Sequence, residues 1–131
     1  MSTTAEADIQ ALFAAYGEAL GRADAAAVAA LFAFPATIRQ GTAARIFADA
    51  ATLAREVDAL IDVFDEAGIA SNVPQVSKIE VAGYAAIARV DWTQAEEAGA
   101  VLNRFAALYS LVREAGAWRI TAMVESGADA G

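Results

Sequence analysis

Apolar residues recur in the first part of the chain at the period of a helix. They fall at i, i+3, i+4, i+7 and i+11, in one stripe made of Ile9, Leu12, Phe13, Tyr16 and Leu20. Thr3 and Glu6 are spaced as a capping box, and Gly21 stands where the end of a helix is expected. The pattern therefore predicts a first helix that begins near Thr3 and ends at Gly21.

A second, shorter helix is predicted after Asp24, which can cap its N-terminus. Its apolar stripe consists of Val28, Leu31 and Phe32. We expect Pro35 to end this helix, because proline has no amide hydrogen and disfavours a helical residue before it. Residues 36–40 then alternate as a strand, and residues 43–47 are expected to be a short strand or extended segment.

A third helix is predicted from Asp49, as its cap, to about Ala67, with Gly68 ending it. Its apolar stripe consists of Leu53, Val57, Leu60, Ile61 and Phe64, and acidic residues dominate the opposite face. We expect that acidic face to be solvated rather than to bind a metal, because nothing in the sequence shows its carboxylates converging.

From Val76 the apolar period changes to two, which is typical of strands. Four strands are predicted, at residues 76–81, 84–94, 101–113 and 117–125, and the turns between them are short. Such strands pair as an antiparallel meander. Helices first and strands afterwards indicate an α+β domain whose helices lie on one face of the sheet.

The composition of the chain limits the kinds of metal site and catalysis that it can support. The chain has 131 residues, enough for a single domain, with an ordered core expected at about 5–126. It contains no cysteine and no histidine, which removes thiolate metal sites, a cysteine nucleophile and the commonest general base. No metal and no cofactor are therefore expected. The net charge of -8 disfavours nucleic acid as a partner.

Membrane segments and export signals are not evident in the sequence. Alanine makes up much of the hydrophobic fraction, and no apolar run approaches the roughly 20 residues that span a bilayer. The N-terminus has no basic region followed by an apolar run. We expect a soluble, cytoplasmic protein without membrane partners.

Three short motifs resemble one superfamily. They are Tyr16-x-x-Ala19-Leu20 with Asp24, then Ala30-Leu31-Phe32 followed by Ala36-Thr37, and finally Gly116-Ala117-Trp118-Arg119-Ile120. The chain resembles the nuclear-transport-factor-2-like (cystatin-like) superfamily, which includes ketosteroid isomerase and the SnoaL-like polyketide cyclases. The resemblance implies a cone-like, strongly curved antiparallel sheet packed on N-terminal helices. It also implies an apolar pocket at the mouth of the cone and a homodimer.

The resemblance to ketosteroid isomerase also bears on activity. That enzyme uses an aspartate base with an oxyanion hole made of a tyrosine and a protonated aspartate. Its tyrosine matches Tyr16, its base falls on Gln40, and its protonated aspartate falls near Tyr109. A glutamine cannot take up a proton, so the isomerase base is absent. Two hydrogen-bond donors without that base favour binding of a carbonyl or phenolic oxygen over proton abstraction.

The predicted strand 84–94 offers another carboxylate. Arg89 and Asp91 share one face, whereas Trp92 belongs to the other. One interpretation is a solvated pair that bridges to a neighbouring strand. The other is a pair inside the pocket, since limonene-epoxide hydrolases of this superfamily use an aspartate–arginine–aspartate group. A second aspartate is missing from the last strand, where Glu125 is too near the end to be assigned that role.

The predicted strand 101–113 is half apolar on both faces. Helices on one side of a sheet should leave the other side polar. Since the second face is also apolar, a homodimer interface is expected to cover it. The alternative is that alanines alone make both faces look apolar.

Three functional hypotheses follow. The first is a pocket that binds a small apolar or aromatic molecule without catalysis. The second is an isomerase, cyclase or dehydratase in which Asp91 is the base, Arg89 its partner and Tyr16 the stabiliser of negative charge. The third is a dimeric scaffold without a ligand. For the pocket, the candidate ligand-binding residues are Tyr16, Gln40, Trp92, Asn103 and Tyr109.

Overall fold

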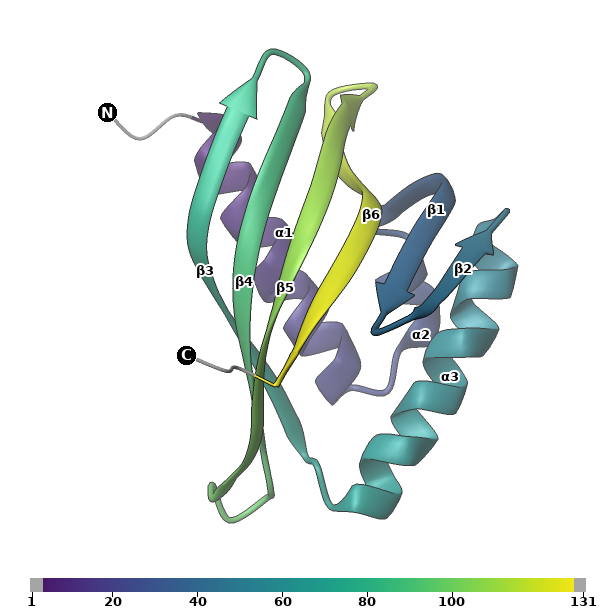
Figure 1. The fold of residues 1–131 in the computed structure, drawn as a ribbon, viewed down its shortest axis with the longest axis vertical. Helices are drawn as coiled ribbons and strands as arrows, with labels where there is room; N and C mark the ends of the chain where they lie inside the picture. The colour runs from purple at the N-terminus through teal and green to yellow at the C-terminus, as the bar shows by residue number, and fades with distance from the viewer. Residues whose placement is uncertain (1–3, 129–131) are drawn as a thin grey trace.

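The structure, a computed structural model, describes residues 4–128 as three helices and six strands (Figure 1). The helices are α1 (Thr4–Gly21), α2 (Ala25–Ala29) and α3 (Ala50–Ala67). The strands are β1 (Phe32–Gln40), β2 (Ala43–Phe47), β3 (Ser71–Ala82), β4 (Ala85–Ala95), β5 (Val101–Glu114) and β6 (Ala117–Ala128). The predicted order of elements is confirmed.

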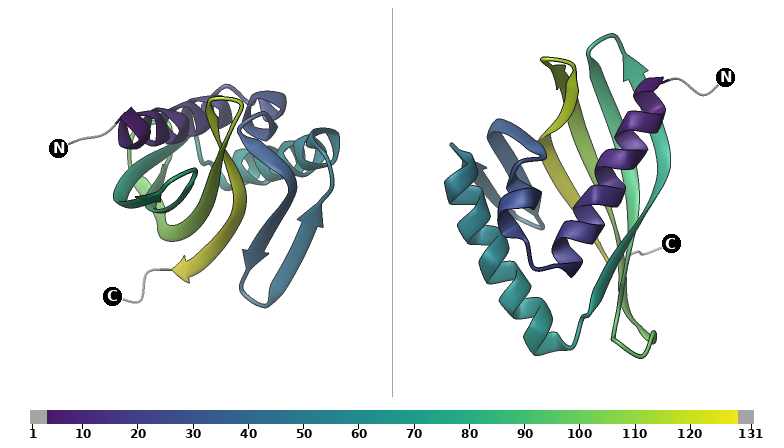
Figure 2. Two further views of the ribbon diagram at one scale, coloured as in Figure 1. Left: turned by 90° about the horizontal axis from the view of Figure 1, so that it is seen from above. Right: turned by 180° about the vertical axis from the view of Figure 1, so that it is seen from behind.

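The strands form one sheet in the order β2-β1-β6-β5-β4-β3. The four C-terminal strands are the predicted antiparallel meander, and β1 joins it by pairing in parallel with β6. The sheet curls around the helices, which all lie on its inner face (Figure 2). This is the α+β architecture that the order of the elements predicts.

The predicted helix caps are confirmed. The Asp24 carboxylate accepts a hydrogen bond from the Ala27 amide, and the Asp49 carboxylate accepts one from the Thr52 amide. Gly68 ends α3 in the left-handed conformation. The proposed capping box of α1 includes Thr3, which lies outside the described residues.

The prediction that Pro35 ends the second helix is wrong. Helix α2 ends at Ala29, and the amide of Ile120 on β6 donates to the Leu31 carbonyl at 2.9 Å, so the chain is already joining the sheet there. Pro35 lies inside β1, between the residues where the register with β6 shifts and just before pairing with β2 begins at Ala36. A missing amide hydrogen is tolerated at such an irregularity.

Strand β3 begins five residues earlier than the change of period suggests, at Ser71 instead of Val76. The extra segment contains Pro74, a residue type that is unusual inside a strand. Since β3 is the last strand of the sheet, one of its edges needs no partner, and proline is tolerated there.

The core lies between the helices and the inner face of the sheet. Its largest fully buried side chains are Ile9, Phe13, Val28, Phe47, Leu53, Val90, Leu111 and Ile120. Most of the apolar stripe of α1 contributes to this core, as predicted. Within residues 4–128, no helix is both long and apolar enough to cross a membrane.

Candidate functional site

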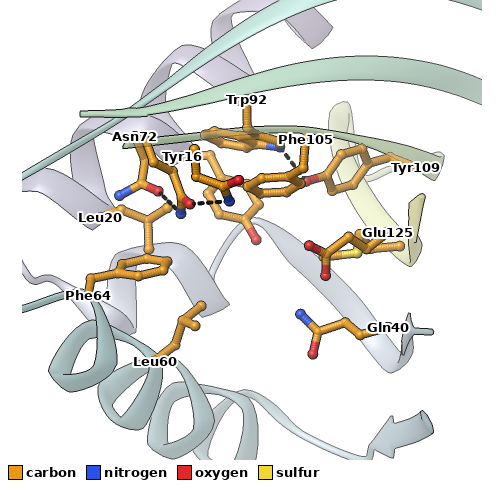
Figure 3. Close-up of a pocket in the computed structure, with 13 residues that line it drawn as sticks. Tyr16, Leu20, Gln40, Leu60, Phe64, Asn72, Trp92, Phe105, Tyr109 and Glu125 are labelled. Atoms are coloured by element: carbon orange, nitrogen blue, oxygen red, sulfur yellow. Dashed lines mark hydrogen bonds between the residues drawn. The ribbon is translucent and has the colours of Figure 1, made fainter. Parts of the chain in front are cut away.

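A hollow of about 160 Å³ opens between the inner face of the sheet and the helices (Figure 3). Its lining is mostly apolar, with a few polar groups, as is usual for small-molecule sites. The lining residues are Tyr16, Leu20, Gln40, Leu60, Phe64, Asn72, Trp92, Gln94, Asn103, Phe105, Tyr109, Met123 and Glu125. All five residues predicted to bind a ligand are among them.

A second hollow of about 80 Å³ adjoins the first and shares Tyr16, Gln40, Leu60 and Met123 with it. For scale, an engineered cavity of about 150 Å³ in another protein holds benzene. The main hollow is therefore matched to a molecule of about one ring, with some room for a substituent toward the second hollow or the mouth.

Tyr16 stands at the centre of an aromatic cluster. Its ring centroid lies 5.2 Å from that of Trp92 and 6.0 Å from that of Phe32, both in edge-on geometry. Figure 3 shows the residue between Trp92 and the open space. Among the described residues, none donates a hydrogen bond to the Tyr16 hydroxyl and none accepts one from it. The hydroxyl is therefore free to donate to an oxygen acceptor in the hollow.

Tyr109 is fixed by its neighbour on the next strand. The Nε1–H group of Trp92 on β4 donates a hydrogen bond of 2.9 Å to the Tyr109 hydroxyl on β5. Because that hydroxyl oxygen acts as an acceptor here, its own proton remains to be donated. Tyr109 therefore offers a second donor beside the one on Tyr16.

Both tyrosines are held in the neutral form. Burial raises the pKa of Tyr16 above its ordinary value. Burial also raises the pKa of Tyr109, and the nearby Tyr16 and Glu125 act in the same direction, against the hydrogen bond from Trp92. The two hydroxyls are consequently hydrogen-bond donors at neutral pH rather than phenolates.

These pKa shifts predict that stability falls in alkaline solution. The unfolded chain loses its tyrosine protons near pH 10, whereas the folded chain retains those of Tyr16 and Tyr109. The stabilisation is complete below about pH 10 and is lost as the pH rises above it, by at most about 1.4 kcal/mol per pH unit for each tyrosine. Urea unfolding from pH 8 to 11 measures the slope. Tyr16→Phe should flatten it, and an unchanged slope in that variant would contradict the prediction.

Three amide side chains form a network at one end of the hollow. Asn103 Nδ2 donates to Gln94 Oε1, and Gln94 Nε2 donates to Asn72 Oδ1, both at 2.9 Å. The sequence analysis chose only Asn103. Gln94 could have been found, since it lies two residues after Trp92 on the same face of β4. Asn72 could not, because the start of β3 was not recognised.

Gln40 and Glu125 occupy the other end of the hollow, across from Asn72 (Figure 3). They are register partners in the parallel pair of β1 and β6. The sequence analysis weighed Gln40 but left Glu125 unassigned. The carboxylate that reaches the hollow is thus on β6, beside the position where the resemblance placed the isomerase base.

Asp91 and Arg89 lie on the opposite face of the sheet from the hollow. Strand β4 alternates as predicted, with Trp92 buried and the other two residues facing outward. The two side chains pair with each other along the strand, with Arg89 Nη2 3.1 Å from Asp91 Oδ1, and are 47% and 40% exposed. This placement removes the geometric basis for Asp91 as a base inside the cone. The pair also bridges along β4 rather than to a neighbouring strand.

Solved structures share this architecture. An NTF2-like protein from Novosphingobium aromaticivorans has a TM-score of 0.75 at 18% identity, covering 99% of this chain and 95% of the other. A protein of unknown function from Mycobacterium tuberculosis has a TM-score of 0.72 at 22% identity, covering 91% and 69%. A ketosteroid isomerase-like protein from Erwinia carotovora atroseptica has a TM-score of 0.68 at 21% identity, covering 96% and 99%. At these identities, the likeness shows the fold alone.

No curated protein matches the sequence. A family model described as "NTF2-like protein (DUF6841)" matches residues 5–128, which is nearly the whole chain. The match agrees with the cystatin-like fold, with the helices on the inner face of the curved sheet, and with the motifs found in the sequence. The chain belongs to this family of NTF2-like proteins.

Proposed function

We propose that this protein binds one small, largely apolar molecule in the hollow of the cone and orients it through hydrogen bonds. The ligand carries a carbonyl or phenolic oxygen that accepts from Tyr16, with Tyr109 as a second donor. A volume of about 160 Å³ limits the enclosed part to about one ring. The cytoplasmic location expected from the sequence stays a prediction.

One observation carries this proposal. The Tyr16 hydroxyl lines an apolar hollow and has no hydrogen-bond partner within the described residues. Buried tyrosines usually find a partner for this group, because an unpaired polar group in an apolar place costs free energy. A bound oxygen would provide the missing partner. An enzyme working through Asp91 has no comparable support, since that carboxylate is on the other side of the sheet.

Tyr16→Phe tests the proposal directly. We expect it to weaken binding of a one-ring ketone or phenol about 2- to 13-fold, because a net hydrogen bond contributes about 0.5–1.5 kcal/mol. Calorimetry or ligand-observed NMR with acetophenone and p-cresol measures the change. The variant should unfold at the same urea concentration as the wild type or at a higher one, because the hydroxyl forms no hydrogen bond with any residue of the described range 4–128.

Tyr84→Phe is the matched control, since Tyr84 is 72% exposed and does not line the hollow. Equal affinities in wild type and Tyr16→Phe would refute the assigned donor. Failure of every one-ring compound to bind would favour the scaffold hypothesis. The exposed Ile46 on β2 and Val63 on α3 would then be the surfaces to examine for a protein partner.

We also propose that a second copy of the chain covers the outer face of the sheet. Three neighbouring strands carry large exposed apolar side chains there, namely Ile87 on β4, Leu108 on β5 and Val124 on β6. A contiguous patch of this kind marks an interaction surface.

The charges on this outer face favour a second copy of the chain as the molecule that covers it. The outward positions of this face include three cations and two acids, namely Lys78, Arg89, Arg104, Glu80 and Asp91. The acidic excess of the chain therefore lies elsewhere, and two such faces meet without strong repulsion. A two-fold interface needs a surface that complements itself, which a face with both charge signs around an apolar centre provides.

Leu108→Glu should convert this dimer to a monomer, because each copy would bury an unpaired carboxylate in the interface. Light scattering coupled to size-exclusion chromatography measures the mass. Val63→Glu is the control, since Val63 is similarly exposed (56% against 55%) but lies on α3. A wild-type protein that is monomeric at tens of micromolar would refute the proposal, as would a dimer that only Val63→Glu disrupts.

A further inference from the structure

We propose that the ligand of this hollow carries a protonated amine, which Glu125 binds at the end opposite the amide network. This inference rests on the proposed function and narrows its ligand class to small cyclic molecules that carry an amine in addition to the oxygen bound by Tyr16. It is drawn from the placement and surroundings of a single carboxylate that the sequence analysis left without a role.

Glu125 is a carboxylate without a cationic partner. It is partly buried on β6 and lines the hollow beside Gln40. Within residues 4–128 the ion pairs are Arg22–Asp24, Arg45–Glu56 and Arg89–Asp91, and none includes Glu125. No hydrogen-bond donor of the described residues reaches the carboxylate either. The Glu125 carboxylate is therefore available to form a charge-assisted hydrogen bond with a cationic group of a ligand.

The charges around the hollow favour a ligand that carries a positive charge. Among the described residues that line the two hollows, the other charged ones are Arg45 and Glu56, which form an ion pair of their own. Glu125 therefore leaves one uncompensated negative charge in the main hollow, in a chain whose net charge is -8. An anionic ligand would meet repulsion from this carboxylate, whereas a cation would be attracted by it.

The remaining groups fit an ammonium group rather than a metal ion. An ammonium group has three donors, and Gln40, whose side-chain amide includes an oxygen acceptor, lines the same end of the hollow as Glu125. Aromatic rings line the same hollow, and their faces attract organic cations. A divalent ion needs several oxygen ligands, and among the described residues no three acidic side chains gather.

Benzylamine and benzyl alcohol are a matched pair of probes. Each has one ring and one substituent of similar size, so each suits a hollow of about 160 Å³, but only the amine carries a charge. Calorimetric titration at pH 7 and low salt measures both dissociation constants. We expect wild-type protein to bind benzylamine at least about tenfold more tightly than benzyl alcohol.

Glu125→Gln tests the assignment because it keeps the shape of the side chain and removes its charge. We expect the ratio of the two affinities to fall to about one in this variant. Glu66→Gln removes the same charge from an exposed position on α3 and should leave the ratio as in the wild type. This control separates the local carboxylate from the overall acidity of the chain.

The outcomes distinguish the two proposals. If benzyl alcohol binds as tightly as benzylamine, or if the amine preference survives in Glu125→Gln, the amine inference is refuted and the proposed pocket stands. If Glu66→Gln reduces the ratio as much as Glu125→Gln does, the preference reflects overall charge and the inference is also refuted. If neither probe binds to wild type, and p-cresol and acetophenone do not bind either, both the pocket and the inference fail.

Discussion

Phe13→Ala is expected to lower the free energy of unfolding by about 3–5 kcal/mol, the cost typical of removing a buried phenylalanine ring. Phe13 is completely buried, and its ring centroid lies 4.7 Å from that of Tyr109 and 6.4 Å from that of Tyr16. The ring thus fills the space behind both proposed donors. Since whole domains of this size are stable by about 5–15 kcal/mol, the loss would be a large share of the total.

Urea unfolding followed by circular dichroism measures this change. Val63→Ala on α3 is the control, because Val63 is mostly exposed and its truncation should change stability by no more than about 0.5 kcal/mol. We also expect Phe13→Ala to weaken ligand binding, since Tyr16 and Tyr109 lose the ring that holds them. A loss below about 1 kcal/mol would contradict the prediction and would mean that the core collapses to fill the space left by the ring.

The sequence predicted the helices and the meander well because their patterns are local. The period of 3.6 in α1 and α3, the caps Asp24 and Asp49, and the period of two after Val76 all lie within short windows. The α2–β1 boundary failed because a distant strand decides it. Phe32 pairs with Ile120 of β6, and the preference of a five-residue helix cannot compete with that pairing.

The residues of the candidate site also fall into two groups, those that a local sequence pattern predicts and those that a distant strand pairing decides. Tyr16 could be placed on the inner side because it lies in the apolar stripe of α1, whereas Tyr109 was placed through the resemblance. Glu125 lies on the same inner side as Ile120, five residues earlier, because the register of β6 against β5 shifts between them and an extra residue on β6 reverses the alternation. No local pattern carries that register. Likewise, the alternation of β4 separates Asp91 from Trp92 but does not tell which face is covered by helices.

A close approach between α1 and β3 has a similar non-local origin. Gly17 is buried where the helix crosses the strand, and a Cβ atom there would lie 2.7 Å from the Asn72 carbonyl oxygen and 2.8 Å from Pro74 Cδ. Real Cβ atoms essentially never come that close to other heavy atoms. Because one neighbour is backbone and the other a proline ring, neither can turn away. Only glycine lets the helix lie this near to the strand.

Gly17→Ala is therefore expected to destabilise the protein, although alanine favours a helix over glycine by about 1 kcal/mol. Overpacking of this kind costs about 1–3 kcal/mol, and contact with backbone puts Gly17 at the upper end, for a net loss of about 1–2 kcal/mol. Gly21→Ala is the matched control on the same helix, since its Cβ would meet nothing within 4 Å. It should leave the melting temperature unchanged or raise it, whereas Gly17→Ala should lower it by several degrees.

The Gly17→Ala substitution should also affect ligand binding in the hollow. If β3 shifts to relieve the contact with residue 17, Asn72 moves with it, and the hydrogen bond from Gln94 to Asn72 is strained. We therefore expect Gly17→Ala to weaken binding of a one-ring ligand, while Gly21→Ala leaves it as in the wild type. Equal stability of the two alanine variants would contradict the tight crossing. A destabilised Gly17→Ala with unchanged affinity would show that the helix moves instead of the strand, and that the amide network does not depend on this contact.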